Sequence, residues 1–148
     1  MTERISLDGE WTLALTEHLG ECREVPAKFH GLAIPAQVPG DVHLDLIRAG
    51  ALPEDLFAGF NIDHTAWVEH KDWWYRREFP SPPGSEGREV FLVFHGLDCY
   101  ATVWLNGVEL GRSANMFIRH EWRLTGRMNR SGPNRIDVRL ASPAGHRP

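Results

Sequence analysis

The feature that most constrains the fold of this chain is a series of short segments in which apolar and polar residues alternate. In residues 134–140, for example, Ile136, Val138 and Leu140 occupy every second position. A period of two places these side chains on one face of a β-strand, as a half-buried strand requires. Segments of this kind occupy residues 9–15, 73–79, 89–94, 101–105, 108–111, 118–124 and 134–140. Short strands separated by turn signals predict an all-β fold, an antiparallel β-sandwich or jelly roll.

Two local signals refine this prediction. Asn106-Gly107 lies between two of the segments, and this dipeptide is the strongest short-range signal for a β-hairpin with a type I′ turn. We therefore expect residues 101–105 to pair with residues 108–111. A further extended segment, residues 33–38, contains Pro35, which cannot donate a hydrogen bond to a neighbouring strand. This segment is expected at the edge of a sheet or as an irregular run.

One short helix is expected among the strands. Asp41 can cap a helix over residues 42–49, and Gly50 can close it in the left-handed conformation. A helix of two turns is not stable without tertiary packing, so we predict that it packs as a lid across one end of the sandwich. The apolar positions that share one of its faces are Val42, Leu46 and Ala49.

The segment after the helix, residues 51–71, has no clear periodicity but contains several aromatic residues. Its aromatic content argues against disorder, and we expect an ordered, functional loop. The chain also has six tryptophans, an unusual number for its length. Trp11 and Trp104 alternate within predicted strands, and we expect both to be buried.

Composition and charge limit the function classes. The chain has 148 residues, the usual size of one domain, so residues 1–148 are expected to form a single domain. A net charge of −4 without a basic stripe makes nucleic acid an unsuitable partner. No segment approaches the length of a membrane span, and the N-terminus lacks the apolar region of a signal peptide. We therefore expect no membrane association and a cytoplasmic location.

The sequence contains no motif for binding a metal ion, a cofactor or a nucleotide. Cys22 and Cys99 lie far apart and lack the clustering of metal ligands, so both are expected to be free thiols, more often buried than reactive. No phosphate-binding loop, dinucleotide fingerprint, nucleophile elbow or His-Glu-x-x-His motif is present. The sequence thus predicts no metal site and no cofactor.

Glycoside hydrolysis by retention needs two carboxylates about 5 to 5.5 Å apart. The nearest candidates in the sequence are the pairs Glu54 with Asp55, Glu69 with Asp72, and Asp41 with Asp45. We interpret them as solvated charges, a helix cap and turn formers. No catalytic residue is therefore expected in this chain.

Residues suited to sugar recognition occur in two predicted loops. An indole face packs on the apolar C–H groups of a sugar ring, and amides and charged groups bind its hydroxyls. Asn61 and Trp67 lie in the long loop, while Asn115 and Arg119 precede the strand at residues 118–124 or begin it. Because the loops of a sandwich gather at its two ends, we expect these four candidate substrate-binding residues at one end.

Several blocks resemble the N-terminal, sugar-binding-like domain of the β-mannosidases of glycoside hydrolase family 2. They occur in the family's order over nearly the whole chain, at residues 7–11, 38–46, 72–79, 94–107, 110–111 and 115–117. This resemblance implies a galactose-binding-domain-like jelly roll that packs against a catalytic (β/α)8 barrel. The barrel carries the acid/base and nucleophile glutamates, and the full-length enzyme hydrolyses terminal non-reducing β-D-mannose residues.

The resemblance implies a non-catalytic domain that lends loops to the sugar pocket of a larger enzyme. The family's jelly roll continues past the position of Pro148, so we expect the chain to be part of a longer protein. One alternative is a free-standing carbohydrate-binding module, which would have its own sugar site. Another is the corresponding domain of a family 2 β-galactosidase or β-glucuronidase. A structural domain that docks a barrel would instead expose an apolar patch and bind no sugar alone, and we favour this reading.

Overall fold

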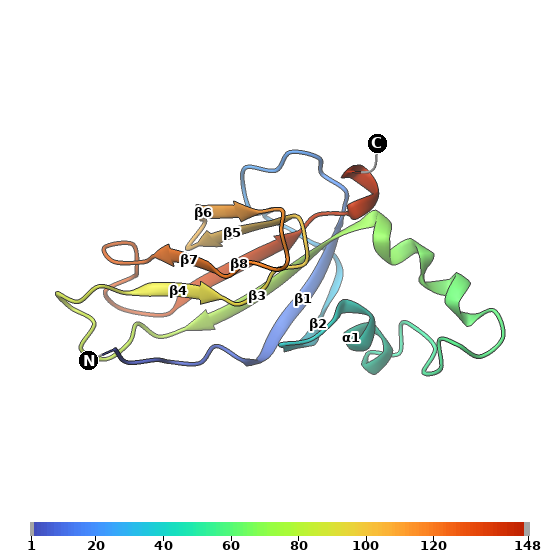
Figure 1. The fold of residues 1–148 in the computed structure, drawn as a ribbon, viewed down its shortest axis with the longest axis horizontal. Helices are drawn as coiled ribbons and strands as arrows, with labels where there is room; N and C mark the ends of the chain where they lie inside the picture. The colour runs from blue at the N-terminus through green and yellow to red at the C-terminus, as the bar shows by residue number, and fades with distance from the viewer. Residues whose placement is uncertain (1, 147–148) are drawn as a thin grey trace.

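A computed structural model of the chain describes residues 2–146, without the side chains of residues 30 and 32. It has two layers of antiparallel strands (Figure 1). The larger sheet has six strands in the order β2-β1-β3-β8-β5-β6, and the smaller sheet pairs β4 with β7. The elements are β1 (Gly9–Glu17), β2 (His30–Val38), α1 (Val42–Arg48), η1 (Asn61–His70), β3 (Lys71–Phe79), β4 (Phe91–Phe94), β5 (Ala101–Leu105), β6 (Val108–Ser113), β7 (His120–Arg123), β8 (Asn134–Leu140) and η2 (Pro143–His146). The all-β sandwich with one short α-helix is confirmed.

The expected strands are present, with different bounds at several ends. β4 begins at Phe91 and β7 ends at Arg123, so both are shorter than the alternating segments that predicted them. The residues beyond these ends are held by a less regular pattern, in which Val90 N donates to Thr125 Oγ1 and Leu124 N donates to Val90 O. The alternating sequence pattern thus extends beyond the residues that form regular β-ladder hydrogen bonds.

The segment containing Pro35 is a full strand, β2, at the outer edge of the larger sheet. Pro35 lies opposite Thr12 of β1. A proline is tolerated there because an edge strand pairs on one side only, so the missing N–H is not needed by a second neighbour. The edge position expected from the sequence is confirmed.

The turn between β5 and β6 has the predicted geometry. Asn106 has φ 50° and Gly107 has φ 83°, and the positive values at both positions are those that a type I′ turn requires. Leu105 pairs with Val108 across it. The Asn106 side chain also fixes the turn to β8, because its Oδ1 accepts a hydrogen bond from Arg135 N at 2.8 Å.

Apolar side chains pack on both faces of the larger sheet. The main cluster lies between the two sheets and contains Trp11, which is buried as expected. On the opposite face Trp74 and Trp104 stack with ring centroids 5.3 Å apart, beneath the loop that carries Cys22. Trp104 is fully buried, which confirms the second tryptophan prediction. Cys22 is buried but Cys99 is only half-buried, so the expectation for the thiols holds for one of them.

Helix α1 has the capping aspartate and the closing glycine that its sequence predicts. Asp41 Oδ1 accepts a hydrogen bond from His43 N at 2.7 Å, and Gly50 has φ 75°. Gly50 N and Ala51 N donate to the carbonyl groups of Ile47 and Leu46, which is the Schellman pattern of helix closure. The helix is one residue shorter than expected because Ala49 is already its C-cap.

Candidate functional site at the loop end of the sandwich

Both loops that carry the candidate residues leave the larger sheet at the same end. Trp73 of β3 pairs with Leu140 of β8, Leu140 pairs with Ala101 of β5, and Ala101 pairs with Ser113 of β6. These residues form one row across the sheet at its end. Helix η1 directly precedes β3, and residues 114–119 directly follow β6. We call this part of the molecule the loop end (η1 with residues 51–60, 95–100 and 114–119); Figure 1 shows η1 projecting from it.

The segment expected to be an irregular loop contains a 3-10 helix, η1, of ten residues. The sequence missed it because only Val68 of this helix is buried, so no apolar period marks it. The helix is held at its base, where Trp73 Nε1 donates to Val68 O at 2.9 Å and Ser142 Oγ donates to Glu69 O at 2.5 Å. The segment is thus anchored at its base, and its residues 61–70 are helical where a loop was expected. Its functional role stays a prediction.

Asn61 and Trp67 both lie on η1. Asn61 Nδ2 donates to Asp55 O at 2.8 Å, which fixes the amide and leaves its Oδ1 directed elsewhere. The Trp67 ring packs against Trp73 with centroids 5.8 Å apart, and about a third of the residue stays exposed. Both side chains are therefore positioned by contacts with neighbouring residues rather than free in solvent.

Asn115 and Arg119 lie on the β6–β7 loop, at the same end as η1. Asn115 Oδ1 accepts a hydrogen bond from Phe117 N at 2.9 Å, which forms a turn within the loop. Arg119 Nη1 lies 2.7 Å from Glu121 Oε2 in an exposed ion pair. The structure thus brings all four candidates to the loop end, and each of them also has a local partner. Their role in sugar binding stays a prediction.

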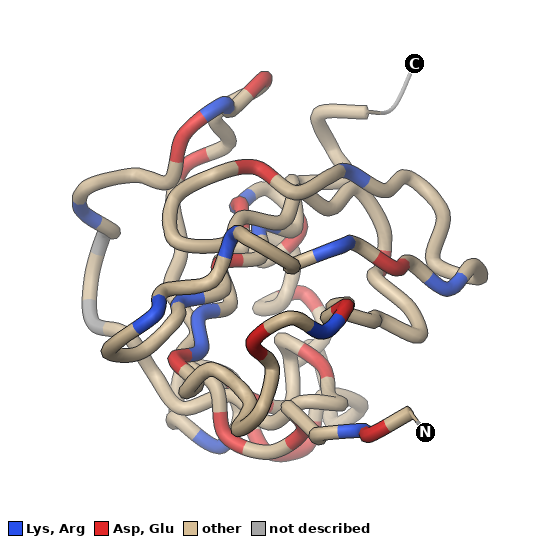
Figure 2. The backbone as a smooth tube through the Cα atoms, turned by 90° about the vertical axis from the view of Figure 1, so that its left-hand side faces the viewer, with Lys and Arg blue, Asp and Glu red and all other residues tan. Residues whose placement is uncertain are grey.

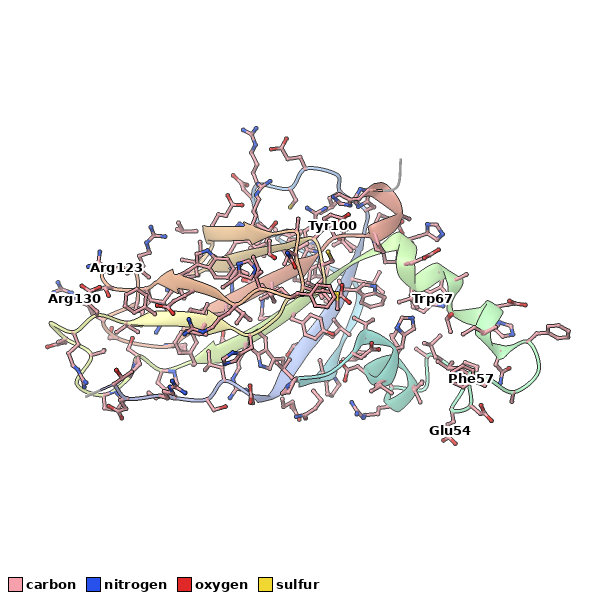
Figure 3. All side chains as sticks on the ribbon, in the orientation of Figure 1. Glu54, Phe57, Trp67, Tyr100, Arg123 and Arg130 are labelled. Carbon is pink, nitrogen blue, oxygen red and sulfur yellow. The ribbon has the colours of Figure 1, made fainter. Side chains whose placement is uncertain are left out.

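The loop end also exposes large apolar side chains that the sequence analysis did not select. Phe57 is 91% exposed, Phe60 is 83% exposed and Phe117 is 86% exposed. The other large apolar residues exposed on these two loops are Ile62, Trp67, Met116 and Ile118. Figure 3 labels Phe57 and Trp67 on the projecting segment, far from Arg123 and Arg130 at the other end. Aromatic residues in a segment without periodicity were the signal that could have identified this surface.

The opposite end of the sandwich is charged and of mixed sign. Figure 2 is viewed from that side and shows Lys and Arg next to Asp and Glu along the backbone. Arg123 pairs with Glu89 there at 2.6 and 2.7 Å, and this contact raises the pKa of Arg123 and lowers the pKa of Glu89. This end therefore differs from the loop end, where Phe57, Phe60 and Phe117 are each more than 80% exposed.

Asp72 is a buried carboxylate at the base of the loop end. Its Oδ2 accepts hydrogen bonds from Leu19 N at 3.0 Å and from Arg139 Nε and Nη2 at 2.9 and 2.6 Å. Its Oδ1 accepts from Ser142 N at 2.8 Å and lies 2.9 Å from His18 Nδ1. Burial raises the pKa of Asp72, but the hydrogen bonds from these four residues outweigh burial and hold the pKa below its usual value.

The interpretation of the acidic pairs as solvated charges is wrong for two residues. Asp72 is fully buried, and so is Asp45 of α1, whose Oδ1 accepts from Gln37 N at 3.0 Å and from Arg48 Nη1 at 2.9 Å. Each carboxylate has cationic and backbone partners, which makes its burial possible.

Two features are absent from residues 2–146. Within that range, no group of three or more His, Cys, Asp and Glu side chains could hold a metal ion. None of the helices described is both long enough and apolar enough to cross a membrane.

The architecture and its loop end define a class of protein, the galactose-binding-like β-sandwich. The family model for the glycosyl hydrolase 2 galactose-binding domain-like domain matches residues 11–147. The chain therefore belongs to this family of glycoside hydrolase family 2 domains. The resemblance noted in the sequence is confirmed.

The most informative relatives are much longer proteins. "Beta-mannosidase B" of Thermothelomyces thermophilus is 41% identical over 97 residues, which is 66% of this chain and 11% of the relative. "Beta-mannosidase" of Capra hircus is 34% identical over 140 residues, 94% of this chain and 14% of the relative. The chain thus spans only about a seventh or less of the length of these relatives.

Solved structures show the same relationship. The β-D-mannosidase from Dictyoglomus thermophilum superposes with a TM-score of 0.79 at 35% identity, over 97% of this chain and 16% of that chain. A β-glucuronidase from Faecalibacterium prausnitzii gives a TM-score of 0.66 at 26% identity, over 93% of this chain and 20% of that chain. Both structures match this chain to a small part of a larger polypeptide.

Proposed function

We propose that this chain is the non-catalytic N-terminal domain of a β-mannosidase that hydrolyses terminal non-reducing β-D-mannose residues. The relatives with 32% to 41% identity are named β-mannosidases, and the Dictyoglomus thermophilum β-D-mannosidase has a higher TM-score and identity than the Faecalibacterium prausnitzii β-glucuronidase. This difference favours the β-mannosidase type over the β-glucuronidase type of family 2 enzyme.

The observation that carries the proposal is the exposure of Phe57, Phe60 and Phe117 at one end of the sandwich. Burial of a phenylalanine side chain stabilises a complex by about 1.5–3 kcal/mol relative to leaving it in water. Clusters of exposed aromatic residues therefore mark interaction surfaces. The partner proposed for this surface is the catalytic (β/α)8 barrel of the longer enzyme.

The same loops would bring polar groups to the sugar pocket of that barrel. Asn61 and Trp67 on η1, with Asn115 and Arg119 on the β6–β7 loop, are the residues proposed to contribute. Asn61 is the best positioned of them, because its Nδ2 is fixed by Asp55 O and its Oδ1 can still accept a hydrogen bond from a sugar hydroxyl. The substrate proposed for the complete enzyme is a β-mannoside.

A domain exchange tests this function. The isolated chain should show no turnover of an aryl β-mannoside above background. The Dictyoglomus thermophilum β-mannosidase should keep turnover when this chain replaces its matching domain, because the docking surface is retained. A double substitution of Phe57→Ser and Phe60→Ser in the chimera should lower its thermal stability and its activity.

The matched control is Val108→Thr, an exposed apolar residue on the hairpin at the other end of β6. This change should leave the chimera unaltered. A chimera that folds but is inactive, or one that tolerates both phenylalanine substitutions, would contradict docking through the loop end.

A further inference from the structure

A groove of about 600 Å³ lies on the outer face of the larger sheet, near the loop end. Its lining comes from β5, β6 and β8, from the loop after β1 and from η2. Thr102 on its floor belongs to the same sheet face as Trp104, which points away from the core between the two sheets. The volume is within the range of cavities that hold small molecules, about 300–1,000 Å³.

The floor of the groove is a cross-strand row of three residues. Thr102 of β5 pairs with Arg112 of β6 on one side and with Arg139 of β8 on the other. Neighbouring strands lie about 4.8 Å apart, so the backbones that carry the two arginines are about 10 Å apart. The short threonine between two long side chains accounts for the hollow.

Both arginines are held in place by hydrogen bonds from their Nε and Nη2 atoms. The Arg139 side chain is only 5% exposed, and its Nε and Nη2 bond Asp72 while Nη2 also donates to Gly20 O at 2.7 Å. Arg112 Nε donates to Glu109 Oε1 at 2.5 Å, and its Nη2 lies 3.5 Å from Cys22 O. Among the described residues, these bonds use Nε and Nη2 and leave Nη1 of each arginine for a ligand or for water.

The charges around the groove favour a neutral ligand over an anion. Asp72 and Glu109 each compensate one arginine, and Glu21 adds a carboxylate to the lining. Arg23 lies 3.6 Å from Glu21, and both side chains are largely exposed. The groove therefore has no excess of positive charge to attract an oxyanion. A sugar hydroxyl fits better, since it can accept from a guanidinium and donate to a carboxylate.

We propose that this groove binds a neutral polyol, a pyranoside sugar, through neighbouring hydroxyls. The hydroxyls accept hydrogen bonds from Nη1 of Arg112 and of Arg139 and donate to Glu21, and Thr102 Oγ1 bonds the same edge of the ring. Tyr100 and His146 stack at 3.8 Å and 7° to form an aromatic wall for the sugar's C–H groups. This site needs no catalytic barrel, so the proposal predicts sugar binding by the isolated domain, in contrast to the expectation from the sequence.

The test is a titration of the isotope-labelled 148-residue chain with methyl β-D-mannopyranoside, followed by amide chemical shifts. We expect saturable shifts at Thr102, Ser113 and Ala141, with a dissociation constant on the order of millimolar for so small a ligand. Arg112→Met should weaken binding about tenfold and Thr102→Val about fivefold, because each removes one hydrogen bond. Thr102→Ser keeps the hydroxyl and should retain the affinity of the unaltered chain.

Arg123→Met is the matched control, because Arg123 is also paired with a glutamate but lies far from Tyr100 in Figure 3. It should bind like the unaltered chain. Near-ultraviolet circular dichroism of the stacked Trp74 and Trp104 shows whether each variant is folded. Thr102→Val that is folded and binds with unchanged affinity would overturn the proposal.

Three further results would overturn it. One is the absence of saturable shifts even at sugar concentrations well above the millimolar range. Another is a set of shifts confined to Asn61, Trp67 and Asn115, which would place sugar at the loop end instead. The third is saturable binding of inorganic phosphate without binding of the sugar, which would make the groove an oxyanion site. All of these outcomes are independent of whether the chain docks a barrel.

Discussion

Replacement of Asp72 by asparagine should destabilise the domain strongly. Asp72 is fully buried and bonds Arg139, whose side chain is 5% exposed, through two hydrogen bonds. Asparagine has a similar shape but no charge, so the guanidinium would stay buried without its counter-charge. Removing one partner of a buried ion pair costs about 3–5 kcal/mol. A domain of this size is stable by only about 5–15 kcal/mol, so the loss would be a large fraction of the total.

The assay is urea unfolding at pH 7, followed by tryptophan fluorescence. Asp72→Asn should shift the midpoint to clearly lower urea, while Asp63→Asn, an exposed aspartate on η1, should leave the midpoint unchanged. The double variant Asp72→Leu with Arg139→Met removes both charges and should recover part of the loss, because no buried charge is left without a partner. A single Asp72→Asn variant as stable as the unaltered chain would refute this account of the carboxylate.

Three other perturbations follow from the same structure. The pKa of Asp72 in the folded chain is lower than its usual value of 3.8. Its contribution to stability should therefore be complete above about pH 4 and should disappear as the pH falls through the folded pKa. Urea unfolding at several pH values should show a shallower acid dependence for Asp72→Asn than for the unaltered chain. Gly107→Val should lower the free energy of unfolding by about 1–2 kcal/mol, because a side chain at φ 83° strains the backbone. No atom lies within 4 Å of the added Cβ, so a clash is not the cause, and an unchanged melting temperature would count against the turn. Gly111→Ala should lower the free energy of unfolding by about 1–3 kcal/mol, because the Cβ of the new alanine would lie 2.2 Å from Trp122 Nε1. An unaltered melting curve would mean that the indole moves freely.

Local signals in the sequence predicted the parts of the fold that depend on neighbouring residues. The alternation at residues 134–140, the Asn106-Gly107 turn and the cap at Asp41 each act within a few positions of the chain, and all three are confirmed. Asp72 could not be predicted in this way. Its partners His18 and Arg139 are 54 and 67 residues away in sequence, so its burial depends on contacts that no local pattern records.

The candidate site was predictable in position but not in full composition. Loops of a sandwich gather at its ends, so Asn61 and Asn115 could be assigned to one end without coordinates. The exposure of Phe57 and Phe60 could not, because an aromatic residue in a loop more often anchors that loop to the core. Nothing in the local sequence distinguishes an anchor such as Val68, which is buried, from a residue that projects into solvent.

The position of Asp72 connects the stability of the domain to the geometry of its loop end. The same carboxylate bonds the loop after β1 through Leu19 N and the chain after β8 through Ser142 N. Ser142 in turn holds the last turn of η1 through Glu69 O. Because η1 carries Asn61 and Trp67, a substitution of Asp72 should change the positions of those two residues although it contacts neither of them. The groove depends on the same carboxylate, since Asp72 holds Arg139 in place. One buried charge therefore positions both surfaces for which a ligand or partner is proposed.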